Sequence, residues 1–111
     1  MRFVPTLVHG IADYVVGLGM IMLAFISGAD GAAFALFILL GVFAILYALA
    51  TDYELGWKPY LTMPAHLVLD GGFAVVMLGL PLVLPMPMLL VWSSLAIGVM
   101  ALFLVVTTRF R

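Results

Sequence analysis

Cysteine is absent from this sequence and charged residues are scarce, with four basic and five acidic side chains among 111 residues. Without cysteine the chain has no disulfide framework, no thiolate metal site and no thiol nucleophile. The net charge of −1 and the lack of any basic run argue against nucleic acid as a partner. Hydrophobic residues make up 68% of the chain, too much for a soluble domain of this size to cover with polar groups. The composition therefore predicts an integral membrane protein whose first partner is the lipid bilayer.

Four hydrophobic stretches are each about 20 residues long, which is the length that a helix needs to cross the hydrocarbon core of a bilayer. We expect them at residues 4–26, 32–50 and 63–84, with a fourth that follows Pro85-Met86-Pro87 and ends near residue 108. The start of the chain has one positive charge and no small-residue cleavage site after it, so the first stretch is predicted to be a retained span. The predicted fold is all-α, four transmembrane helices in a single membrane domain over residues 1–111.

The basic residues predict the orientation of these spans. Arg2, Lys58, Arg109 and Arg111 lie at the two ends of the chain or in the central connection, residues 51–60, and the other two loops have no lysine or arginine. By the positive-inside rule, both termini and the central connection are expected on the cytoplasmic side.

An internal repeat runs through the chain, with a constant offset equal to the separation of His9 from His66. The same offset relates Asp13 to Asp70, Met20 to Met77, Gly41 to Gly98 and Thr51 to Thr108. Each repeat, residues 1–54 and residues 55–111, is expected to form a hairpin of two spans. Two spans return the chain to its starting side, so both hairpins have the same orientation. The expected symmetry is a pseudo-two-fold axis along the membrane normal.

Two His-x-x-x-Asp motifs, His9 with Asp13 and His66 with Asp70, are the most distinctive chemical feature of the chain. The four-residue spacing puts both side chains on one face of a helix, and the repeat puts the two motifs at a similar depth. Ionisable residues inside a span are costly and usually mark a functional site. Two imidazoles and two carboxylates suit Zn²⁺ and other borderline divalent ions. The pattern also resembles the intramembrane zinc site of cation diffusion facilitators, where His/Asp-x-x-x-Asp occurs on two helices.

Other interpretations of these four residues remain open from the sequence. Parallel histidines at matching depth are also what a membrane haem b requires, with the aspartates orienting the imidazoles. Histidine titrates near neutral pH, which favours a role in proton handling. In the simplest interpretation, each histidine hydrogen-bonds an aspartate and holds the helices together without any ligand.

Three short motifs carry a resemblance to a known family: His9-Gly10-x-x-Asp13-Tyr14, Thr51-Asp52-Tyr53-Glu54-Leu55-Gly56 and Met63-Pro64-x-His66-Leu67-x-Leu69-Asp70. In this order they resemble the SPW-repeat family of small bacterial membrane proteins, which is built as two tandem hairpins. The Ser-Pro-Trp triplets that name the family are replaced here by Leu23-Ala24-Phe25 and Leu80-Pro81-Leu82. The resemblance covers nearly the whole chain and implies a four-helix fold in the bacterial inner membrane, but no biochemical activity.

The sequence is compatible with three functions of different classes. We favour a non-catalytic accessory or assembly subunit, bound to a larger membrane complex or to copies of itself. The alternatives are a membrane protein that binds a divalent metal or haem through His9, Asp13, His66 and Asp70, and a small oligomeric transporter that uses them as its ion site. An enzyme is not expected, because the sequence shows no nucleophile–base pair, phosphate-binding loop or cofactor fingerprint.

The central connection is the predicted docking site for a partner protein. It combines charge with aromatic side chains on the side of the membrane that carries the termini. The residues expected to take part are Asp52, Tyr53, Glu54, Trp57, Lys58 and Tyr60.

Overall fold

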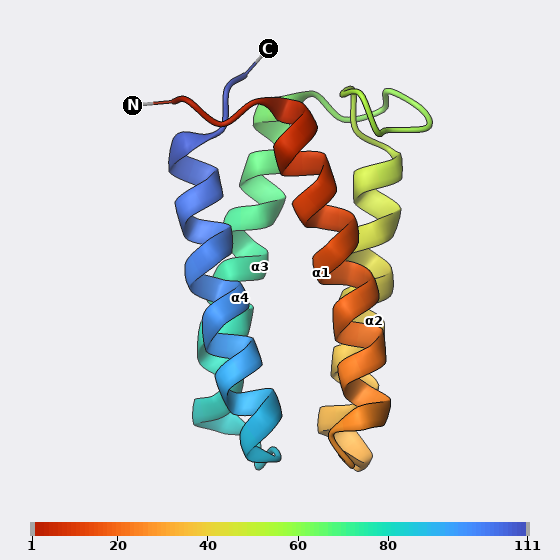
Figure 1. Ribbon diagram of the computed structural model, residues 1–111, viewed down its shortest axis with the longest axis vertical. Helices are drawn as coiled ribbons and strands as arrows, with labels where there is room; N and C mark the ends of the chain where they lie inside the picture. Colours follow the sequence, from red (N-terminus) through yellow and green to blue (C-terminus); the bar gives the residue numbers. More distant parts are fainter. Residues whose placement is uncertain (1, 111) are drawn as a thin grey trace.

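The computed structural model describes residues 2–110, which form four helices joined by two short turns and one longer central connection (Figure 1). The helices are α1 (Thr6–Ile26), α2 (Gly31–Leu49), α3 (Met63–Val83) and α4 (Met88–Thr107). All four are long and apolar enough to cross a membrane. The predicted four-helix membrane fold is therefore confirmed. Arg111, one of the cations used above to predict orientation, lies outside the described residues.

The helices pack as two hairpins, α1 against α2 and α3 against α4 (Figure 1). Glycines allow the close approach within each hairpin. A Cβ atom on Gly41 would lie 2.7 Å from the carbonyl oxygen of Gly17, and one on Gly98 would lie 3.3 Å from that of Ala74. Small residues at a crossing let membrane helices gain van der Waals contact along their backbones, which is a main source of their association in lipid.

The connections within the hairpins follow from turn-forming residues. Gly28 and Gly31 have φ angles of +75° and +57°, and this left-handed conformation favours glycine. In the second hairpin, α3 ends before Pro85 and α4 begins directly after Pro87. Proline is well suited there because the first amide groups of a helix have no partner within the helix.

Pro81 lies inside α3 and leaves one carbonyl group of that helix without its usual donor. The affected oxygen is that of Met77, one turn earlier. The hydroxyl of Ser94, a fully buried residue of α4, donates a hydrogen bond to it. Ser94 therefore replaces the missing backbone bond and ties α4 to α3.

The repeat offset also relates elements of the structure. The bounds of α3 are those of α1 shifted by this offset, and the first residues of α2 and α4 are separated by the same offset. There are two isolated parallel bridges, Val4 with Thr108 and Leu61 with Thr51. The repeat offset relates Val4 to Leu61 and Thr51 to Thr108, so each bridge is the repeat equivalent of the other. Each bridge joins the segment that enters one hairpin to the segment that leaves the other, so the hairpins are linked at the end of the bundle that carries the termini (Figure 1).

The half of the bundle away from the termini is filled by apolar side chains. Met20, Phe37, Met77 and Leu90 have no exposed surface and belong to one continuous cluster of buried residues. They come from all four helices, so this cluster packs the two hairpins against each other.

Candidate metal centre

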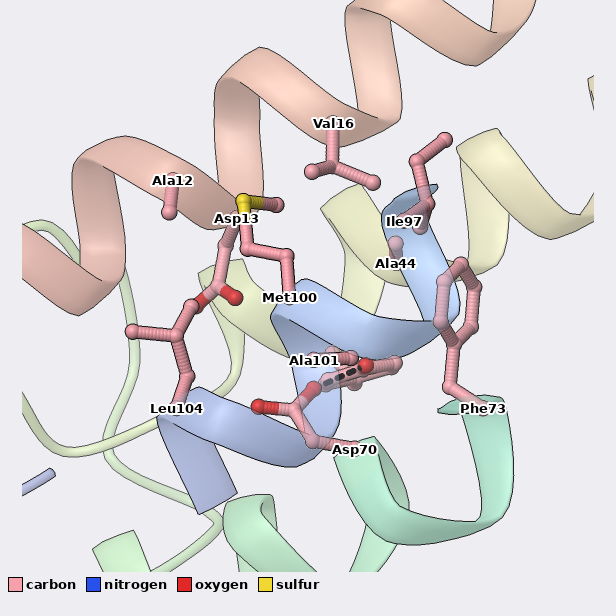
Figure 2. Close-up of a pocket in the computed structure, with 11 residues that line it drawn as sticks. Ala12, Asp13, Val16, Ala44, Asp70, Phe73, Ile97, Met100, Ala101 and Leu104 are labelled. Carbon is pink, nitrogen blue, oxygen red and sulfur yellow. Dashed lines mark hydrogen bonds between the residues drawn. The ribbon is translucent and has the colours of Figure 1, made fainter. Parts of the chain in front are cut away.

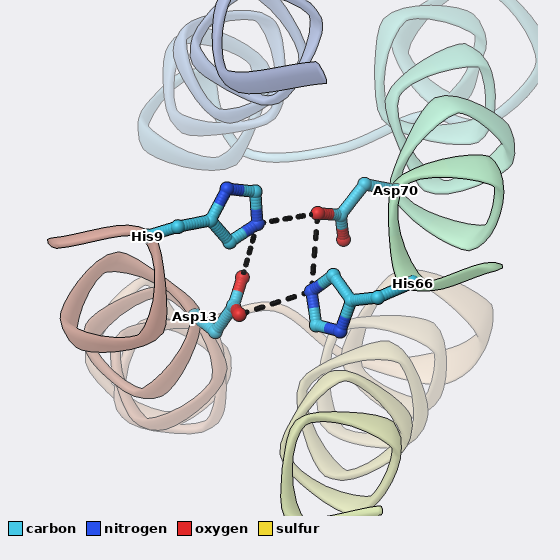
Figure 3. A group of neighbouring side chains, drawn as sticks. All are labelled: His9, Asp13, His66 and Asp70. Carbon is cyan, nitrogen blue, oxygen red and sulfur yellow. Dashed lines mark hydrogen bonds and ion pairs between the residues drawn. The ribbon is translucent and has the colours of Figure 1, made fainter. Parts of the chain in front are cut away.

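His9 and Asp13 of α1 face His66 and Asp70 of α3 between the two hairpins (Figure 3). One nitrogen or oxygen atom from each residue lies within 4.8 Å of the corresponding atoms of the other three. We call these four residues the His/Asp cluster. The helical spacing and the repeat predicted that these four residues come together, and the structure shows them as one buried cluster.

Each imidazole of the cluster faces both carboxylates. The Nε2 atom of His9 lies 2.7 Å from an oxygen of Asp70 and 3.3 Å from one of Asp13. The Nε2 atom of His66 lies 3.0 Å from Asp13 and 3.2 Å from Asp70. Both histidine side chains are fully buried, while those of Asp13 and Asp70 are 10% and 7% exposed. The four polar groups therefore interact with one another in a site with little access to water.

The second ring nitrogen of each imidazole, Nδ1, is hydrogen-bonded to a threonine hydroxyl. The Nδ1 atom of His9 lies 2.7 Å from Oγ1 of Thr108, and Nδ1 of His66 lies 2.7 Å from Oγ1 of Thr51. Each threonine belongs to the hairpin opposite its histidine, and the two pairs are exchanged by the repeat. Thr51 and Thr108 were visible in the sequence as a repeat-related pair, but only the fold shows what they contact.

A tyrosine hydroxyl holds each carboxylate in the same way. Tyr53 in the central connection donates to Asp13 over 2.6 Å, and Tyr47 of α2 donates to Asp70. Burial, followed by the charge of Asp13, raises the pKa of Tyr53 above its usual range, so the phenol stays protonated and donates. The sequence analysis missed this role for both residues, because the repeat places Leu104 and Phe110 at the equivalent positions and Tyr53 was expected on the docking surface instead.

The hydrogen bonds of Thr51 determine the tautomer of His66. The hydroxyl of Thr51 donates its single proton to the carbonyl oxygen of Tyr47 over 2.6 Å, so it accepts from Nδ1 of His66. A neutral His66 then has an unprotonated Nε2 directed at Asp13 and Asp70. Among the described residues this buried nitrogen has no hydrogen bond of good geometry, although both carboxylates lie close to it.

The charge balance of the cluster depends on the protonation of its two imidazoles. Two neutral imidazoles and two carboxylates carry a net charge of −2, which is costly in a buried site inside a membrane. A lone pair on Nε2 of His66 would also face the lone pairs of two carboxylates. One divalent cation between the four groups, or one extra proton on each imidazole, brings the cluster to neutrality.

A small cavity lies beside the two carboxylates, between the hairpins (Figure 2). Its volume of about 20 Å³ is enough for roughly one water molecule. Apart from Asp13, Asp70 and Tyr47 its lining is apolar, so it does not provide a polar path through the bundle. The apolar lining residues include Val16, Ala44, Phe73, Ile97, Ala101 and Leu104.

The central connection divides into an exposed part and a buried part. Trp57 and Tyr60 are 76% and 77% exposed, and the ammonium group of Lys58 lies 5.2 Å from the centre of a ring of Trp57. Tyr53, expected on the docking surface, is instead buried at 5% exposure because its hydroxyl bonds to Asp13. The role of the exposed part as a docking site stays a prediction.

Comparison of the chain with family models, with curated proteins and with solved structures finds no match. The resemblance to the SPW-repeat family stays a prediction from its three motifs. The function proposed below is therefore argued from the geometry of the cluster.

Proposed function

We propose that this protein binds a divalent transition-metal ion of the Zn²⁺ type within the membrane, with His9, Asp13, His66 and Asp70 as ligands. The observation that carries the proposal is the Nε2 atom of His66. It is buried, Thr51 places the proton of a neutral ring on Nδ1, and Nε2 lies 3.0 Å from Asp13 and 3.2 Å from Asp70 without a hydrogen bond of good geometry among the described residues. An imidazole nitrogen in that state, beside two carboxylates, has the donor properties of a zinc ligand.

The spacing of the cluster supports four-coordinate binding. Ligand atoms about 2.1 Å from a tetrahedral zinc ion lie roughly 3.4 Å from one another. The nitrogen–oxygen distances of the cluster are between 2.7 and 3.3 Å, and one donor atom from each residue lies within 4.8 Å of the other three. A rearrangement of the side chains that lengthens the short nitrogen–oxygen contacts and shortens the longer separations would admit the ion.

The outer hydroxyl groups support the same interpretation. Metal-binding histidines usually hydrogen-bond through their second ring nitrogen, and ligating carboxylates are usually hydrogen-bonded as well. Here every residue of the cluster has such a partner: Thr108, Thr51, Tyr53 and Tyr47. These contacts fix the direction of each ligand before any ion binds.

A haem between the two histidines is less compatible with this arrangement. The imidazole rings are 5.1 Å apart between centroids and lie edge to face. Asp13 and Asp70 fill the space between them, so a flat macrocycle would have to displace both carboxylates.

The depth of the cluster favours a resident ion over a transported one. His9 is the fourth of the 21 residues of α1, so the cluster is roughly 5 Å from one end of the helix and 25 Å from the other. The far half is filled by Met20, Phe37, Met77 and Leu90, which offer an ion no polar ligand. Within the described chain the site therefore has polar surroundings on the side of the termini only.

The positions of Arg2, Lys58 and Arg109 support a cytoplasmic location for the termini and for the near face of the cluster. The bacterial inner membrane as its location rests on the resemblance to the SPW-repeat family alone. An accessory role in a larger membrane complex is compatible with a bound ion and stays a prediction from the sequence.

Elemental analysis of the protein purified in mild detergent tests the metal proposal. After equilibration with Zn²⁺ and dialysis, we expect about one zinc ion per wild-type chain and a loss of most of it in His66→Ala. Asp30→Asn is the matched control, because it removes a carboxylate from the loop at the opposite end of the bundle and should retain the ion. A wild-type protein that holds no metal under these conditions would contradict the proposal. The positive charges that balance the two carboxylates would then be protons on the imidazoles.

A further inference from the structure

The segment formed by residues 53–56 covers the His/Asp cluster and is held on α1 by three hydrogen bonds. Tyr53 donates to Asp13 over 2.6 Å, and the hydroxyl of Thr6 donates to Glu54 over 2.6 Å. Tyr14 donates to the carbonyl oxygen of Leu55 over 2.7 Å. All three partners lie on the first three turns of α1, which is the part of the helix that carries the cluster.

Gly10, the residue next to His9, provides the surface on which this segment rests. A Cβ atom on Gly10 would lie 3.1 Å from Cδ1 of Leu55 and 3.3 Å from the ring of Tyr53. The ring of Tyr53 also lies 5.4 Å from that of His66, between centroids. Residues 53–56 therefore pack directly against both histidine-bearing parts of the site.

A larger cavity, open to solvent, lies at the outer edge of this segment. It is lined by Pro5, Thr6, Glu54 and Arg109 and has a volume of about 370 Å³. At about 30 Å³ per water molecule this volume holds on the order of ten waters, which is enough for a divalent ion with its first hydration shell. Glu54, a member of the covering segment, contributes a carboxylate to this cavity.

We propose that the metal ion enters from the side of the termini through this cavity, and that residues 53–56 are the gate that lifts from α1 to admit it. This inference rests on the proposed metal-binding function. Met20, Phe37, Met77 and Leu90 offer no polar group on the opposite side, and the cavity on the side of the termini contains the carboxylate of Glu54 together with the guanidinium of Arg109. Because Tyr53 is part of the gate, its movement uncovers the Asp13 carboxylate during entry, and its return restores the hydrogen bond that orients this carboxylate in the bound state.

An engineered disulfide between the gate and α1 tests the proposal. The Cβ position of Gly10 lies 3.3 Å from Cβ of Leu55, close to the range of about 3.5–4.5 Å found in disulfides. The chain has no other cysteine, so oxidation of Gly10→Cys/Leu55→Cys forms a single defined crosslink. We expect zinc uptake, followed by stopped-flow measurement with a fluorescent chelator, to be slower by roughly tenfold or more in the oxidised form. Reduction with a phosphine should restore the rate. Because free thiols can bind zinc themselves, Gly10→Cys and Leu55→Cys alone are the matched controls, and the oxidant should leave their uptake rates unchanged.

A second variant weakens the gate without a crosslink, in case the cysteines disturb packing at Gly10. Tyr14→Phe removes only the bond to Leu55, so uptake and release should both accelerate, by about three- to tenfold, with the equilibrium affinity unchanged. Tyr60→Phe is the control, because this exposed tyrosine of the same connection should leave both rates unchanged. Wild-type uptake rates in both the oxidised disulfide variant and Tyr14→Phe would overturn the gate, whereas absence of zinc from the wild type would overturn the metal site itself.

Discussion

The hydroxyl of Thr51 determines which ring nitrogen of His66 carries the proton, and therefore which one faces the carboxylates. Thr51 donates to the carbonyl of Tyr47, so it can only accept from His66, and the unprotonated nitrogen is turned toward the carboxylates. The four members of the cluster were predictable, because their spacing and repeat are visible in the sequence. The direction of each ring was not, because it depends on hydroxyl groups that the fold brings from the ends of other helices.

Replacing this hydroxyl should weaken the metal site. Thr51→Val keeps the shape of the side chain and removes the acceptor for Nδ1 of His66, leaving a buried N–H without its partner. We expect zinc affinity to fall about 10- to 100-fold, as is typical when an outer partner of a ligand is lost. Competition with a chelator of known affinity measures the change. Thr51→Ser, which retains the hydroxyl, should bind zinc nearly as well as the wild type, and equal affinities of the valine and wild-type proteins would refute the orienting role.

At the scale of elements, the helices were predictable and the central connection was not. Each span is long and apolar enough for hydropathy alone to place it, and turn residues such as Gly28 and Pro87 mark its limits. The central connection has no such periodicity. It folds back because the carbonyl of Leu49, at the end of α2, accepts from the amides of Trp57 and Lys58. Such backbone pairing leaves no pattern of side chains in the sequence.

The hydrogen bond from Ser94 to the carbonyl of Met77 should contribute to the stability of the α3–α4 hairpin. Ser94→Ala leaves the carbonyl of Met77 buried without a donor and should destabilise the protein by about 1–3 kcal/mol. In the background of Pro81→Ala the new backbone N–H can bond to Met77, so the same serine substitution should cost much less. Unfolding the four proteins in detergent gives the double-mutant cycle. Ser93→Ala is the control, and additive effects of the two substitutions would show that serine does not compensate for proline.

At the scale of the whole molecule, the repeat explains why the cluster lies between the hairpins. Each hairpin contributes one histidine and one aspartate, and its terminal threonine bonds to the histidine of the other hairpin. The symmetry was predictable from the constant offset between the two repeats. The departures from it were not, because Tyr47 and Tyr53 have no polar counterparts in the second repeat. The cluster and the two bridges thus join the hairpins at the same end of the bundle.

An ion that joins the hairpins should stabilise the whole protein. Binding to the folded state alone adds RT ln(1 + [L]/Kd), which is about 2.7 kcal/mol when free zinc is 100 times Kd. We therefore expect zinc to raise the unfolding temperature of the wild type in detergent. Asp70→Asn should abolish this increase, because it replaces a ligand whose oxygen lies 2.7 Å from His9 and 3.2 Å from His66. If the cluster instead joins the hairpins by hydrogen bonds between protonated histidines and the two carboxylates, the same substitution will lower the unfolding temperature and zinc will change it in neither protein. The two explanations differ because only a bound ion makes the stability depend on the concentration of metal.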